Sequence, residues 1–320
     1  MRTWGRHWIW LCMCWLCCPI RVHNASFAQV ADARSSIAAA ALLRSTVSKL
    51  GKTDSGNAYT VFKDVLYPGA AGEQTADVYL PEKEFEAPRP ALLVIHGGGW
   101  FAGDKGGTRQ LELAQLAIDE GYVAVSINYS LTKFAGGNPR AQKLRAGWPN
   151  NLFDCKCALR WMKQHALALG IDADRIAVAG GSAGGHLALM LGLSARHETL
   201  NEMGGFQKND TAVSCIIDFY GATNLQNFEV YSLFSEHDRY DLKMHALASP
   251  VEHVCKDSPP MLILQGSLDN DVEPVHSDEL AAKARLLGVV CEYVLVEGAG
   301  HGFGLRAGRR DLRQIGRAHV

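Results

Sequence analysis

The sequence lacks an excess of charge of either sign. Its 320 residues carry 32 Lys and Arg against 33 Asp and Glu, a formal net charge of −1. This balance gives no electrostatic footprint for nucleic acid or for an anionic membrane surface. Hydrophobic residues make up 48% and charged residues 20%, as in an ordinary globular protein, and the length suits one large α/β domain or two small ones.

The cysteines that follow the N-terminal segment lack zinc-binding spacing, because they form no C-x-x-C and no Cys/His pattern. They are Cys155, Cys157, Cys215, Cys255 and Cys291. Their odd number predicts at least one free thiol or an intermolecular bridge, and for most of them burial as small hydrophobic side chains is the simplest interpretation. We expect neither a metal nor a cofactor.

The N-terminal segment has the layout of a secretory signal peptide. Two arginines precede the apolar run WIWLCMCWLCCPI, and Ser26 and Ala28 supply the small residues of a cleavage site. The run is short for a membrane span, and an uncleaved anchor is the alternative. We therefore expect a signal peptide over residues 1–28 and a secreted or periplasmic protein.

An Ala- and Ser-rich stretch, residues 29–58, predicts a helical or loosely ordered spacer, and one domain is expected over residues 59–314. Within it, eight segments have strand character, the first two as a hairpin: 58–68, 74–81, 89–95, 123–131, 175–180, 213–221, 259–266 and 291–300. Helical patterns alternate with the later ones, which favours an α/β fold with a mostly parallel, eight-stranded, doubly wound sheet. The irregular piece 222–258 predicts a small cap insertion.

The stretch VAGGSAGGH contains a G-x-S-x-G centred on Ser182, between a predicted strand and a predicted helix. That context is typical of a nucleophile turn, in which glycines permit a strained serine backbone and close chain approach. A phosphate loop would require G-x-x-x-x-G-K-[ST], and no lysine follows here. Ser182 is therefore the candidate nucleophile.

A serine nucleophile needs a base and an orienting acid, which in this architecture follow it at the ends of later strands, acid before histidine. The segment LILQGSLDNDVEP offers Asp269 and Asp271, and VEGAGHGFG offers His301. Asp269, three residues beyond Gly266, is the favoured acid, and Asp271 is the alternative.

Donors for an oxyanion are expected in HGGGW, residues 96–100, after the third predicted strand. Backbone N–H groups of Gly98 and Gly99 can join that of Ala183 at the start of the following helix. The side chains nearby allow two roles each. His96 either shapes this loop or touches substrate, and Trp100 is either a pocket wall or a core anchor.

Two further polar residues are predicted to be structural. His186, on the helix after the serine, is interpreted as a packed histidine rather than a second base. Asp154, on an amphipathic helix, is expected to be a solvated or capping carboxylate.

The chain from about Tyr59 to Leu305 resembles the α/β-hydrolase superfamily, and within it hormone-sensitive-lipase-like and bacterial feruloyl/acetyl carbohydrate esterases. The likeness rests on IHGGGWFAGDK, WPNNLFDCKCALRWMK, DADRIAVAGGSAGGHLALMLG, GSLDNDVEPVHS and GAGHGFG. It implies Ser182 as nucleophile, Asp269 as acid and His301 as base. Where many relatives carry YRLAPE, this sequence has YSLTKFAGGNPRAQKLRAGWP, a longer loop expected to wall the substrate pocket.

The last six residues, IGRAHV, are those encoded by ATCGGAAGAGCACACGTC, the sequence of a widely used short-read sequencing adapter. We therefore interpret residues 315–320 as a library artefact and expect the natural chain to be longer.

These features predict a serine esterase acting on a small-molecule or carbohydrate ester. An arylformamidase and a prolyl-oligopeptidase-like peptidase share parts of the pattern and remain alternatives; the peptidases usually carry an N-terminal propeller, for which there is no room. A non-catalytic binding module would normally have lost one of the three candidate residues. Oligomeric state is not predicted.

Overall fold

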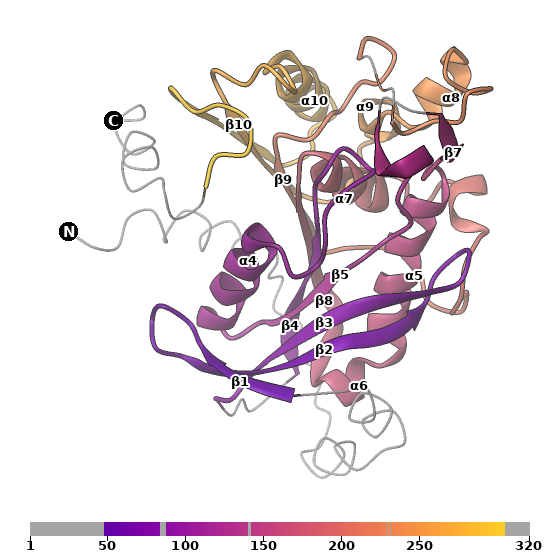
Figure 1. Ribbon diagram of the computed structural model, residues 1–320. Coiled ribbons are helices and arrows are strands. Elements are labelled where there is room, and N and C mark those ends of the chain that lie inside the picture. Colours follow the sequence, from indigo (N-terminus) through magenta and orange to yellow (C-terminus); the bar gives the residue numbers. More distant parts are fainter. Residues whose placement is uncertain (1–47, 84–87, 140–141, 229, 231, 305–320) are drawn as a thin grey trace, which may run out of the picture.

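The computed structural model describes residues 48–304, except 84–87, 140–141, 229 and 231. The predicted signal peptide, the spacer up to residue 47 and residues 315–320 lie outside the described residues. A twisted nine-stranded sheet runs through the molecule (Figure 1). Its strands, in spatial order, are β1 (Ser48–Lys52), β2 (Ala58–Pro68), β3 (Glu73–Pro81), β5 (Val123–Ile127), β4 (Arg89–Ile95), β8 (Ile171–Gly181), β9 (Cys215–Phe219), β10 (Met261–Gly266) and β11 (Cys291–Val296).

Strands β5, β4, β8, β9, β10 and β11 are parallel, whereas β1, β2 and β3 pair antiparallel at one end of the sheet. This confirms the doubly wound, mostly parallel sheet and the predicted hairpin of β2 and β3. The expected count of eight strands was one too low. The additional strand is β1, which lies in the predicted spacer and is paired with β2 from Ser48↔Phe62 to Lys52↔Ala58.

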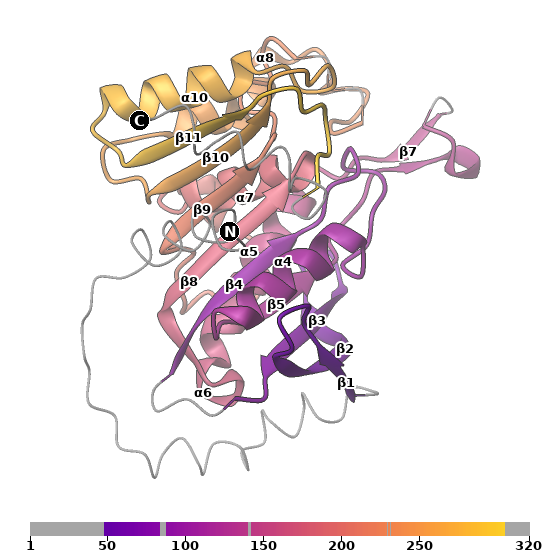
Figure 2. The same ribbon diagram turned by 90° about the vertical axis from the view of Figure 1, so that its left-hand side faces the viewer.

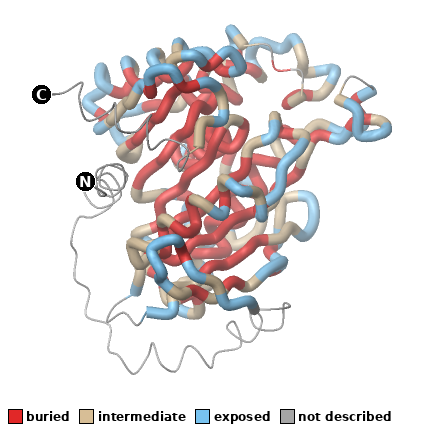
Figure 3. The backbone as a smooth tube through the Cα atoms, turned by 60° about the vertical axis from the view of Figure 1, so that its left-hand side comes forward, coloured by how far each residue is buried: buried red, intermediate tan, exposed pale blue. Residues whose placement is uncertain are grey.

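Helices cover both faces of the sheet (Figure 2). On one face, α5 (Asn150–Gln164), α7 (Ala183–Leu193) and α10 (Val275–Leu286) contribute to the larger apolar cluster with alternate side chains of the strands. On the other face, α4 (Thr108–Asp119) packs on Leu92, Val94 and Ala124. Figure 3 shows the resulting buried centre, which the central strands of the sheet run through.

The remaining elements are short. They are β6 (Lys133–Phe134), β7 (Lys143–Arg145), the 3₁₀ turns η1 (Ala135–Gly137) and η2 (Thr199–Asn201), and the helices α6 (Ala166–Leu169), α8 (Leu242–Leu247) and α9 (Pro250–His253). Both α8 and α9 lie within residues 222–258, the piece for which the sequence predicts a small cap insertion. The cysteines of the described chain are all free thiols, and Cys155, Cys157 and Cys215 are buried, as expected for small hydrophobic side chains.

Because the central strands are parallel, their carboxyl ends share one edge of the sheet. His96 follows β4, Ser182 follows β8, Asp269 follows β10 by three residues and His301 follows β11 by five. The fold therefore gathers residues that are up to 205 positions apart (301 minus 96) in sequence.

Candidate active site

Ser182 occupies a strained turn between β8 and α7, with φ 57° and ψ −124°. Its backbone N–H donates to the carbonyl of Phe219 at 2.8 Å, which anchors the turn to β9. The flanking glycines are required by close approach: a Cβ on Gly180 would lie 2.1 Å from the carbonyl oxygen of Gly184, and one on Gly184 would lie 2.3 Å from that of Ile95. The glycines of the G-x-S-x-G pattern therefore allow backbone segments to pack closely around Ser182.

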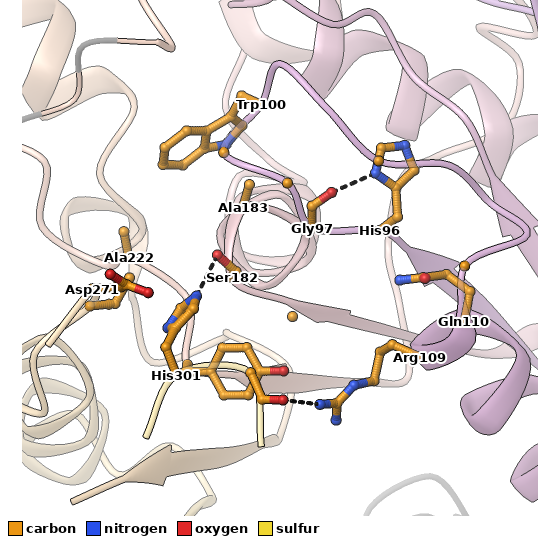
Figure 4. A pocket seen from close by; sticks show the side chains of 18 of the residues that line it. His96, Gly97, Trp100, Arg109, Gln110, Ser182, Ala183, Ala222, Asp271 and His301 are labelled. Atoms are coloured by element: carbon orange, nitrogen blue, oxygen red, sulfur yellow. Dashed lines mark hydrogen bonds between the residues drawn. The ribbon is translucent and has the colours of Figure 1, made fainter. Parts of the chain in front are cut away.

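Ser182, His301 and Asp269 form a continuous chain of contacts. Figure 4 shows the contact between His301 and Ser182. His301 Nε2 lies 2.9 Å from Ser182 Oγ, and His301 Nδ1 lies 2.8 Å from Asp269 Oδ2. The Asp269 side chain is fully buried. The carboxylate accepts a hydrogen bond from the Nδ1–H group, which leaves Nε2 with a lone pair facing the serine hydroxyl.

The two candidate acids are separated by their contacts. Asp269 meets His301, whereas Asp271 is exposed and lines the pocket in front of it. The backbone N–H groups of Asp271 and Val272 donate to Asp269 Oδ1 at 3.0 and 2.9 Å. Asp271 therefore helps to hold Asp269 through its main chain, not through its carboxylate.

Gln265 is a supporting residue that the sequence reasoning missed. Its amide Nε2 donates to Asp269 Oδ2 at 3.2 Å and to the carbonyl of Val272 at 3.0 Å, and its Oε1 accepts from Ser277 Oγ at 2.9 Å. A fully buried glutamine inside the apolar strand MLILQG was the available signal, because a buried amide must find partners.

The loop after β4 presents backbone donors to the pocket. Gly98 and Gly99 have positive φ values of 115° and 58°, which L side chains rarely adopt. In the part of the chain that the structure describes, the N–H groups of Gly98, Gly99 and Ala183 donate to no other backbone group, and all three residues line the pocket. Ala183 is also the first residue of α7, where the helix dipole favours negative charge.

His96 shapes this loop. It is buried, its Nδ1 lies 2.7 Å from the carbonyl oxygen of Gly97, and its ring stacks on Tyr129 with centroids 4.3 Å apart. Burial lowers the pKa of the imidazole, so the neutral ring donates from Nδ1. Of the two roles left open for His96, these contacts describe the shaping of the loop, and the residue also lines the pocket.

Trp100 is both pocket wall and core anchor. It lines the pocket, is 6% exposed, and donates its indole N–H to His186 Nδ1 at 3.1 Å. His186 Nε2 in turn lies 2.8 Å from the carbonyl oxygen of Ala248 in the insertion. Burial lowers the pKa of His186 to about 4, and the packed interpretation of this histidine is confirmed.

The prediction that Asp154 is a solvated or capping carboxylate was wrong. Its side chain is fully buried and accepts hydrogen bonds from the backbone N–H groups of Ala70 at 2.6 Å and Ser130 at 2.7 Å, and from Gln74 Nε2 at 3.2 Å. It therefore fastens two loops to α5. The helical pattern could not reveal this, because all three partners come from distant segments.

A pocket of about 900 Å³ opens above Ser182 (Figure 4). Its side-chain lining combines aromatic and apolar residues with polar and charged ones: Trp100, Phe101, Ala222, Phe228 and Val272, and Asp104, Thr108, Arg109, Gln110, Glu112, Tyr220 and Asp271. The long loop 129–149 was expected to wall this pocket, but none of its described residues lines it. The loop acts one layer further out, where Phe134 packs edge-on against Phe101, with centroids 5.9 Å apart.

Within the described ranges no group of three or more His, Cys, Asp or Glu side chains could hold a metal ion. Among the same residues, no helix has both the length and the apolar character needed to cross a membrane.

The sequence model of the BD-FAE family matches residues 76–284. This range covers all of the parallel strands except β11, which lies at the edge of the sheet. The chain belongs to the BD-FAE family. Ser182 and Asp269 fall inside the matched range and His301 lies 17 residues beyond it (301 minus 284).

Other family likenesses agree with an α/β-hydrolase fold. The chain is similar to esterase LipQ of Mycobacterium tuberculosis, with 31% identity over 76% of this chain and 58% of LipQ. It is also similar to ethyl acetate hydrolase of Pseudomonas putida, with 32% identity over 67% of this chain and 65% of that protein. The chain therefore spans less than two thirds of each. A truncated carbohydrate esterase from gut microbiota shares the fold, with a TM-score of 0.61, 23% identity, and coverage of 75% of this chain and 88% of that one.

Proposed function

We propose that this protein is a serine esterase in which Ser182 is the nucleophile, His301 the base and Asp269 the orienting acid. The observation that carries the proposal is the unbroken contact chain from Ser182 Oγ through His301 to the buried Asp269 carboxylate, at 2.9 and 2.8 Å. Membership of the BD-FAE family and similarity to esterases support the same activity.

In the proposed reaction, His301 Nε2 takes the hydroxyl proton as Ser182 Oγ attacks the ester carbonyl carbon. The carbonyl electron pair moves onto oxygen, and the N–H groups of Gly98, Gly99 and Ala183 stabilise that oxyanion. The intermediate collapses, and the alcohol leaves with the proton from His301. Water, activated by the same imidazole, then hydrolyses the acyl-enzyme.

The pocket favours an ester with an apolar or aromatic acyl group and a hydroxyl-rich alcohol. Trp100 and Phe228 offer apolar surface, whereas Thr108 and Glu112 offer polar groups to hydroxyls. We therefore propose short-chain, acetyl or feruloyl esters of plant polysaccharide as the substrate class. The similarity to a carbohydrate esterase from gut microbiota is in keeping with this class.

The test compares wild type with Ser182→Ala on p-nitrophenyl acetate. We expect the variant to lose about 10⁴- to 10⁶-fold in kcat, because no other group forms the acyl-enzyme. Equal rates would remove the nucleophile role. A panel of acetyl, butyryl and feruloyl esters, a p-nitroanilide and an N-formyl arylamine then separates esterase, peptidase and arylformamidase activity.

We further propose secretion or export to the periplasm, on the basis of the apolar segment and the small residues at 26 and 28. N-terminal sequencing of the exported protein is expected to begin at Gln29. A mature chain that retains residues 1–28 would contradict cleavage.

A further inference from the structure

Arg109 contacts the segment that carries His301, although the two residues come from opposite parts of the chain. Arg109 lies in the first turn of α4, after β4, whereas His301 follows β11 at the far end of the sheet. The guanidinium Nη2 donates to the carbonyl oxygen of Gly302 at 3.2 Å and also to that of Phe303. Figure 4 shows this side chain reaching toward the His301 segment.

The hydrogen bonds that hold the His301 loop are unevenly distributed. Before His301, the loop is tied to the loop after β10 by backbone bonds such as Leu268 N–H to Ala299 O at 2.9 Å. After His301, in the ranges that the structure describes, the Gly302 and Phe303 carbonyls accept hydrogen bonds from Arg109 alone. Within the described residues, Arg109 therefore supplies the side-chain hydrogen bonds on the second side of this loop.

Arg109 also braces His301 through an aromatic ring. Its guanidinium lies over the rings of Phe219 and Tyr220, 5.5 and 5.7 Å from their centroids. The Tyr220 ring meets His301 and Phe303 edge-on, with centroids 4.8 and 5.1 Å apart. Tyr220 is itself fixed, because its backbone N–H donates to the carbonyl of Leu264 at 2.9 Å.

Ion pairing does not explain the placement of Arg109 among the described residues. Among the described residues it has no carboxylate partner within ion-pair distance, and its Nη1 is buried without a hydrogen-bond partner. A guanidinium chosen for stability alone would be expected to satisfy that nitrogen. The hydrogen bonds that it does make are those to the His301 segment.

We propose that Arg109 is a positioning residue for His301, holding the Gly302 and Phe303 carbonyls and the Tyr220 ring so that Nε2 stays within hydrogen-bond reach of Ser182. This inference rests on the proposed role of His301 as base. A displacement of a catalytic group by about 1 Å can cost about 100-fold in rate, so the effect falls on kcat rather than on substrate binding.

The test uses the full chain with Arg109→Ala, Arg109→Lys and the matched control Arg196→Ala on p-nitrophenyl acetate. Arg196 is a surface residue paired with Asp257 at 2.6 Å, so its loss removes a charge away from the site. We expect kcat of Arg109→Ala to fall by about 30- to 100-fold with KM within about 2-fold of wild type. Arg109→Lys, which keeps one cationic donor for the carbonyls, is expected to recover about 10-fold, and Arg196→Ala to equal wild type.

Two results would overturn the proposal. One is an Arg109→Ala kcat equal to wild type. The other is a rise in KM with unchanged kcat, which would make Arg109 a substrate-binding residue. If Arg109→Ala is unfolded by circular dichroism, Arg109→Lys carries the test, with an expected fall of about 3- to 10-fold in kcat at unchanged KM. Ser182→Ala, assayed in parallel, distinguishes a failure of the proposed esterase from a failure of the Arg109 inference.

Discussion

Asp269→Asn gives the sharpest test of the proposed chemistry, because the structure fixes how the new amide must lie. Asp269 Oδ1 accepts two backbone N–H groups, at 3.0 and 2.9 Å, and Oδ2 accepts from His301 at 2.8 Å and from Gln265 at 3.2 Å. The backbone donors cannot rotate. The oxygen of the introduced amide must therefore take the Oδ1 place, and its NH₂ group must face His301.

That orientation changes which ring nitrogen of His301 carries the proton. With a donor opposite Nδ1, the ring proton moves to Nε2, which then donates to Ser182 Oγ and cannot accept its proton. We expect kcat to fall by about 10⁴-fold, which corresponds to about 5.4 kcal/mol of transition-state stabilisation. KM should change little, because neither His301 nor Asp269 supplies the apolar surface of the pocket.

The matched control is Asp271→Asn, which removes the same charge two residues away. Asp271 is exposed and its backbone N–H, which the substitution leaves in place, makes the contact to Asp269. We expect kcat within about 3-fold of wild type, or less than about 0.7 kcal/mol. The assay is p-nitrophenyl acetate hydrolysis at fixed pH, with circular dichroism to confirm folding. If both variants lose activity equally, or if Asp269→Asn keeps more than about a tenth of it, the assignment of the acid is refuted.

Three further predictions concern groups around the nucleophile turn. Gly184→Ala is expected to cost about 2 kcal/mol or more, since the new Cβ would lie 2.3 Å from the Ile95 carbonyl oxygen; an unchanged urea midpoint would contradict this. Burial raises the pKa of Asp218 to about 7, so the folded protein holds a proton that the unfolded chain releases, and unfolding free energy falls as pH rises from about 4 to 7. Above that pH range, Asp218→Asn should remove a destabilisation of the folded state on the order of 4 kcal/mol. If denaturant titrations show that the unfolding free energies of variant and wild type change equally between pH 5 and pH 8, this prediction is disproved. Burial lowers the pKa of His186 to about 4. The neutral ring therefore contributes folding stability that is lost as pH falls from about 6.5 toward 4. At the lower pH a second ring proton on Nδ1 would displace the Trp100 indole N–H. His186→Gln should weaken that acid dependence in the same assay, and an acid limb as steep as in wild type would refute the role of His186.

The candidate site was predictable to the extent that parallel strands dictate it. Ser182 and His301 stand out because a glycine-rich turn and a histidine between glycines each follow a predicted strand, and the ends of parallel strands share one edge. The choice between Asp269 and Asp271 was only a preference in the sequence, since both belong to one short loop. Their separation depends on which side chain turns inward, and that is decided by main-chain contacts.

Residues that act across the fold escaped prediction. Arg109 opens a helix and would ordinarily be a solvated residue, and only the arrival of the chain after β11 gives it a role. Asp154 has the same character, because its partners come from loops near residues 70 and 130. The strand Ser48–Lys52, SKLGK, has no regular apolar alternation, and its conformation follows from pairing with β2.

The relay from Trp100 through His186 to the Ala248 carbonyl has a consequence for engineering the insertion 222–258. Altering this piece is an obvious route to new specificity, because Ala222 and Phe228 border the pocket. Yet the same piece supplies the acceptor that fixes the His186 tautomer, and His186 in turn holds the tryptophan beside the proposed oxyanion donors. A grafted insertion must therefore reproduce one carbonyl at the position of residue 248, or a change meant for substrate choice will also loosen the loop that carries these proposed donors.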